Sequence, residues 1–170
     1  HMKAKTIDEV IFYLDKIVKE AKEDNSPVGY FAALYRKVTF RVKEGIINGE
    51  FENGERMERL DVIFANRYLE AYQLYTKGKS SSKSWEIAFC EANNYWTIVL
   101  QHILLGINAH INLDLGIAAA ETAGENPIIE LKNDFEKINH ILSNLVGEVQ
   151  EELSQIWPTL KKILLITGKI

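Results

Sequence analysis

Apolar residues recur with the period of an α-helix along almost the whole chain, and only three prolines interrupt them. An α-helix has about 3.6 residues per turn, so apolar residues three or four apart share one face. Pro27, Pro127 and Pro158 each stand where an apolar stripe stops or starts. Proline cannot donate the hydrogen bond that a helix interior needs. This pattern predicts an all-α protein, and the 170 residues are enough for a single domain across residues 1–170.

The breaks in the pattern divide the chain into five long helices, with a short terminal helix after Pro158. We expect the long helices at about residues 7–24, 29–48, 55–77, 84–123 and 127–157. The first and fifth have clear polar faces and should lie outside. The expected architecture is therefore a bundle of five to six helices around a largely buried central helix, at about residues 84–123.

Local signals support two of these boundaries. Thr6 and Glu9 form a capping box, in which Thr6 accepts from the Glu9 amide and Glu9 reaches back. Two Asn-Gly pairs at 48–49 and 53–54 favour left-handed backbone. The stretch between the second and third helices is therefore predicted to be a loop. It is long enough for a short hairpin at 49–54 but for no further strand.

Composition narrows the classes of partner. The chain has 24 acidic and 20 basic residues and no basic block, which argues against nucleic acid as the main partner. No run of about 18 apolar residues occurs, so no membrane span is expected.

Cys90 is the single cysteine, which excludes an intrachain disulfide. The N-terminus has no signal pattern, and His1-Met2 resembles a cloning scar plus start codon, so a cytoplasmic location is expected.

The stretch "QHILLGINAHINLDLGIA" at 101–118 is apolar enough to be buried, yet it carries two histidines and Asp114. His110 and Asp114 are four residues apart, so their side chains meet on one helix face. Such a pair can supply two metal ligands, orient the imidazole as a base, or form a satisfied structural contact. His102 lies eight residues before His110, about 12 Å along the axis, and should not join them.

The third predicted helix also carries a charge in its apolar stripe, because Asp61 stands between Leu60 and Val62. A buried carboxylate needs a partner or a shifted pKa. The candidate partners are Arg41, Arg67 or a histidine of the central helix. Antiparallel packing of the two helices would bring Asp61 to His110 and Asp114.

Another histidine, His140 on the fifth predicted helix, should be partly exposed, although it could also supply a third metal ligand.

Two blocks, "RMERLDVIFANRYLEAY" at 56–72 and "LLGINAHINLDLGIA" at 104–118, resemble a mostly bacterial helical family known as domain of unknown function 5995. The resemblance implies a helical fold across the second to fifth helices and transfers no activity. The matching motif positions are Asp61, Arg67, Tyr68, Asn108, His110, Asn112 and Asp114. Family members tend to continue past the point where this chain ends, so we expect a shortened member or a fragment.

Two hypotheses of function follow. In the first, the protein is a hydrolase with His110 as base or metal ligand, Asp114 and Asp61 as further carboxylates, and Arg67 as an anion clamp. A divalent metal would be held by His110, Asp114 and Asp61, although none of the usual metal-ligand spacings occurs.

In the second hypothesis, the same residues fix the packing of a non-catalytic helical module that binds a partner or a small apolar ligand. The apolar run at 163–166 also predicts a homodimer.

Overall fold

The computed structural model describes residues 2–26, 28–92, 115–124, 131–141 and 144–145. The helices in these ranges are α1 (Ile7–Glu23), α2 (Val28–Ile47), α3 (Gly54–Thr76), α4 (Lys83–Ala92) and α6 (Gly116–Ala123), with a further helical segment at 132–141. These ranges contain no strand, which confirms the all-α prediction. The alternative of a hairpin at 49–54 is wrong, because those residues form a turn that leads into α3.

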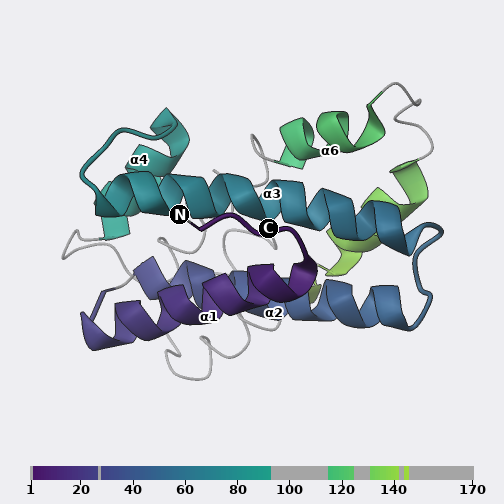
Figure 1. Ribbon diagram of the computed structural model, residues 1–170, viewed down its shortest axis with the longest axis horizontal. Coiled ribbons are helices and arrows are strands. Elements are labelled where there is room, and N and C mark those ends of the chain that lie inside the picture. Colours follow the sequence, from purple (N-terminus) through teal and green to yellow (C-terminus); the bar gives the residue numbers. More distant parts are fainter. Residues whose placement is uncertain (1, 27, 93–114, 125–130, 142–143, 146–170) are drawn as a thin grey trace, which may run out of the picture.

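Helix α3 is the element that joins the other described helices. It packs against α1 and α2 on one side and against α4 and α6 on the other. Figure 1 shows the resulting layers, with α1 and α2 below α3 and with α4 and α6 above its opposite ends. Because α3 is covered from several directions, 11 of its 23 residues are buried.

The segment predicted as the central helix is represented by its two ends, α4 and α6. Trp85, Ala88 and Phe89 of α4 are buried, as are Ala118 and Thr122 of α6. Residues 93–114, which contain His110 and Asp114, lie outside the described residues. Among the described helices, none has both the length and the apolar character needed to cross a membrane.

Local capping largely follows the sequence signals. The Thr6 hydroxyl accepts a hydrogen bond from the Glu9 amide at 3.2 Å. Glu9 reaches back as predicted, but its carboxylate accepts from the Lys5 amide at 2.6 Å. The Glu9 side chain therefore binds the amide of the residue before the N-cap, instead of the amide of Thr6 itself.

Helices α2 and α3 end in the same motif, with a glycine just past the helix. Gly49 and Gly78 have φ of 68° and 64°, in the left-handed region that residues with a Cβ avoid. The second Asn-Gly pair behaves differently from the prediction. Asn53 caps α3 by accepting from the Arg56 amide at 2.9 Å, and Gly54 is the first helical residue.

Helices α1 and α2 form an antiparallel hairpin. Two ion pairs, Asp8 with Lys43 and Asp15 with Arg36, join them. The earlier residue of α1 pairs with the later residue of α2, as an antiparallel arrangement requires. Near the turn a Cβ on Gly29 would stand only 2.6 Å from the Ala21 Cβ, so the lack of a side chain permits the close approach.

The helical segment 132–141 is anchored by a fully buried carboxylate, Asp134. Its oxygens accept from the backbone amides of Glu52 at 2.7 Å and Asn53 at 3.2 Å, and from Arg56 at 3.5 Å. These donors precede and open α3, where the helix dipole also favours a negative charge. Asp134 therefore connects the helical segment at 132–141 to the first turn of α3.

We expect Asp134→Ala to lower the free energy of unfolding by on the order of 3 kcal/mol, because Arg56 and two backbone amides lose a buried acceptor. Urea unfolding followed by circular dichroism measures the change. Glu136→Ala, an exposed carboxylate on the same segment, should change stability by less than about 0.5 kcal/mol. A loss for Asp134→Ala as small as that of the control would contradict the anchoring role.

Candidate functional site

Asp61 lies on the buried face of α3, as its place in the apolar stripe predicted. Its residue exposure is only 4%, and its Oδ2 atom is buried with no hydrogen-bond partner within the described part of the chain. Met57 and Phe64, one turn away on either side, are also buried. Burying a carboxylate without a partner costs free energy, so this position is unusual for a purely structural residue.

The environment of Asp61 favours the protonated acid. Burial, together with a smaller effect of the nearby Glu58 charge, raises the pKa of its carboxyl from 3.8 to about 7. A carboxylic acid with this pKa can both donate and accept a proton near neutral pH.

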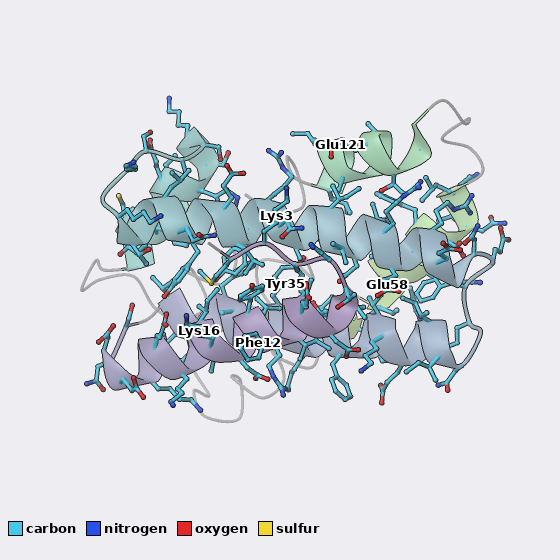
Figure 2. All side chains as sticks on the ribbon, viewed as in Figure 1. Lys3, Phe12, Lys16, Tyr35, Glu58 and Glu121 are labelled. Carbon is cyan, nitrogen blue, oxygen red and sulfur yellow. The ribbon has the colours of Figure 1, made fainter. Side chains whose placement is uncertain are left out.

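A cluster of aromatic rings lies further along the buried face of α3 that carries Asp61. Tyr68 lies two turns after Asp61 on the same face of α3, and its ring centroid is 5.1 Å from that of Phe31, 5.2 Å from Trp85 and 5.8 Å from Tyr35. Burial raises the pKa of the Tyr68 hydroxyl well above its usual range. In Figure 2, Tyr35 points from the lower layer toward α3. The buried face of α3 is therefore apolar and aromatic along much of its length.

Neither arginine considered as a partner binds Asp61. Arg41 pairs instead with Glu50, at 3.1 Å between Nη2 and Oε2, and this carboxylate raises the pKa of Arg41. Arg67 is half-buried on α3 but projects about 120° around the axis from Asp61. Among the candidates for a partner, these two arginines are therefore not observed at Asp61, and the histidines of the central segment lie outside the described residues.

His110 and Asp114, the other predicted members of the site, lie outside the described residues. Their convergence with Asp61 therefore stays a prediction. No group of three His, Cys, Asp or Glu side chains able to hold a metal occurs in the ranges that the structure describes. Of the predicted site residues that the structure describes, Asp61 is the one with a buried side chain and a pKa near neutral pH.

A second feature, which the sequence did not indicate, is an open pocket of about 700 Å³ around His140. Arg41, Glu50 and Phe51 line one wall, and Lys137, His140 and Ile141 line another. His140 is exposed, as predicted, and its Nε2 lies 3.2 Å from the Asn144 Nδ2. The pocket brings together residues more than 80 positions apart, a proximity that helical period alone does not reveal.

The family model described as "Family of unknown function (DUF5995)" matches residues 7–170. The chain belongs to this family. No curated protein and no solved structure matches the chain significantly. The first DUF5995-like block, residues 56–72, lies wholly within α3, so the family resemblance and the buried acid coincide on one helix.

The pH dependence of stability tests the state of Asp61. The unfolded carboxyl releases its proton near pH 4, whereas the folded one holds it to about pH 7. Stability is therefore lost as the pH rises between these values, by on the order of 4 kcal/mol. Asparagine does not titrate, so Asp61→Asn should resemble the unsubstituted protein at pH 4 and exceed its stability at pH 8.

Urea unfolding of both proteins at pH 4 and pH 8 measures this difference. Asp15→Asn, which changes an exposed carboxylate of the α1–α2 hairpin, is the matched control. If Asp61→Asn were less stable than the unsubstituted protein at pH 8, the carboxylate would have a stabilising partner and the described environment would be contradicted.

Proposed function

We propose that this member of the DUF5995 family is a hydrolase of a small molecule, with Asp61 as an acid–base group. The observation that carries the proposal is the buried Asp61 carboxyl, which has no hydrogen-bond partner in the described part of the structure. A buried carboxyl without a partner lowers the stability of the fold. A role in function is a reason for the chain to keep Asp61 at this position.

In the proposed reaction, His110 acts on water, either as a general base or as the ligand of a divalent metal, and Asp114 orients its imidazole. Asp61 in its acid form donates a proton to the leaving group. Arg67 balances negative charge on the substrate. If a metal takes part, His110, Asp114 and the ionised form of Asp61 would hold it, in place of the acid role of Asp61.

The test is turnover of a panel of chromogenic esters and phosphoesters. Asp61→Asn and His110→Ala should each lower kcat by about 100-fold or more while retaining the helical circular dichroism spectrum. Activity that depends on protonated Asp61 should fall as the pH rises above about 7. Asp15→Asn should behave as the unsubstituted protein. Full activity in both site variants would refute the proposal, and metal analysis of protein purified without chelator tests the metal.

A binding module is the second candidate, and the pocket around His140 favours it. This pocket has an apolar wall from Phe51 and Ile141, and its lining also carries charges of both signs, which suits a small polar ligand. The charged side chains are Arg41, Lys137, Glu50, Glu52 and Glu136. It does not include Asp61. A panel without turnover, together with ligand-induced shifts of the His140 resonances, would support this candidate over the hydrolase.

We also propose a cytoplasmic homodimer. Cys90 is a free and exposed thiol, which suits a reducing compartment. Phe12 is 64% exposed and Phe40 is 45% exposed, beside the two ion pairs that join α1 to α2. Large exposed rings of this kind often mark an interface. The apolar run at 163–166, which motivated the prediction, lies outside the described residues.

Light scattering should therefore give about twice the chain mass of 19.4 kDa. Phe12→Glu should return the protein to the monomer mass without loss of helix content, because a charge on that face opposes its burial. Lys19→Glu, on an exposed position of α1, is the control. A strictly monomeric mass for the unsubstituted protein at high concentration would refute the dimer.

A further inference from the structure

The segment before α1 lies along α3 and is held there through its backbone. In Figure 1 this segment crosses the front of α3, running in the opposite direction to that helix. Residues 2–5 have no regular secondary structure of their own. We call these four residues the strap.

Two side-chain amides of α3 bind the strap in the same way. Gln73 accepts from the Met2 amide at 3.0 Å and donates to the Met2 carbonyl at 2.8 Å. Asn66 accepts from the Ala4 amide at 2.7 Å and donates to the Ala4 carbonyl at 2.9 Å. Each amide thus satisfies both backbone groups of one residue, as a neighbouring β-strand would.

A third side chain of α3 continues the row. Glu58 accepts from the Ile7 amide at 3.1 Å, where the strap gives way to α1. Glu58, Asn66 and Gln73 are eight and seven residues apart, which places them within about 80° of one another around the axis, so they share one side of α3. We call the surface that they form the strap groove.

The side chains of the strap alternate between the groove and the solvent. Ala4 is only 3% exposed, and Met2 is partly buried against the core. Lys3 and Lys5 are exposed, and Figure 2 shows Lys3 in front of α3. The groove therefore accepts an apolar residue and a small residue two positions later, and it does not select the residue between them.

The groove is also partly organised without the strap. The Gln73 Nε2 donates to the Leu69 carbonyl of α3 at 3.2 Å, in addition to its bond with Met2. This bond within the helix orients the amide, so its oxygen is aimed at an incoming backbone amide. A pre-oriented donor and acceptor lose less entropy when they bind a peptide.

We propose that the strap groove is a binding site for an extended peptide with the pattern apolar–any–small, and that residues 2–5 occupy it as an exchangeable ligand in cis. Binding through backbone hydrogen bonds, with side-chain pockets at alternate residues, is a general mode of peptide recognition. The strap has no regular secondary structure of its own, and the neutral hydrogen bonds that hold it to Asn66 and Gln73 are individually weak, so a second peptide can replace them one for one. This inference does not depend on the proposed hydrolase.

The experiment opens the strap in the full chain and supplies its sequence as a separate peptide. Ala4→Glu places a charge in the small buried position, and Ala4→Pro removes the amide that donates to Asn66. Either variant should move the nuclear magnetic resonance signals of the Asn66 and Gln73 side-chain amides away from their original positions. Lys3→Pro is the matched control, because no described bond of the strap uses the Lys3 amide.

The peptide HMKAKT at millimolar concentration should then return those amide signals toward their original positions in the Ala4 variants. The peptide HMKEKT should not do so. The unsubstituted protein should bind HMKAKT at least about tenfold more weakly, because its own strap competes at a high effective concentration. Gln73→Ala in the opened chain should weaken binding by about tenfold or more, since two hydrogen bonds to the peptide are lost.

Three results would overturn the proposal. The amide signals could remain at their original positions in both folded Ala4 variants, which would make the strap a fixed part of the fold. They could move without responding to HMKAKT. They could also respond equally to HMKAKT and HMKEKT, which would show that the groove does not select a small residue at the position of Ala4.

Discussion

The rest of the structure depends on the burial of α3 between two layers of helices. A helix covered from several directions has little water to satisfy its polar side chains, so these must find partners within the protein. Asn66 and Gln73 bind the backbone of residues 2–4, and Arg59 donates to the Thr122 carbonyl of α6. The polar residues of α3 thereby fix how neighbouring segments are placed along it.

Asp61 is the exception to this rule, and that exception gives it functional weight. It has the burial of a core residue but, among the described residues, no hydrogen bond to offset it. Its burial, with a smaller effect of the Glu58 charge, favours the protonated acid. Stability alone would be better served by an apolar residue there.

Asp134 and the strap show two other ways in which this fold uses polar groups. Asp134 is buried like Asp61 but fully engaged, so it stabilises the start of α3. The strap is held by the neutral side-chain amides of Asn66 and Gln73, whose hydrogen bonds are individually weak. The same helix therefore carries a rigid anchor at its first turn, an acid suited to chemistry in its middle, and a replaceable contact along one side.

The sequence by itself determined the helices and the faces that they bury, because helical period and capping are local properties. The predicted bounds of α1, α2 and α3 agree with the structure to within one residue, and the stripe that holds Asp61 correctly predicted its burial. Asp134 could also have been suspected, since it shares a helical stripe with the buried Leu131 and Ile138. The matched family covers residues 7–170 and so includes α3, without adding an activity.

Only the tertiary structure decided which polar groups meet. Arg41 binds Glu50 rather than Asp61, and Asp134 reaches amides 81 and 82 residues earlier in the chain. Asn66 could not be assigned to the Ala4 backbone from its own neighbourhood, because that contact spans 62 residues. Helical period fixes the direction of a side chain relative to its own axis, whereas its partner depends on how separate helices pack and where the turns between them lead.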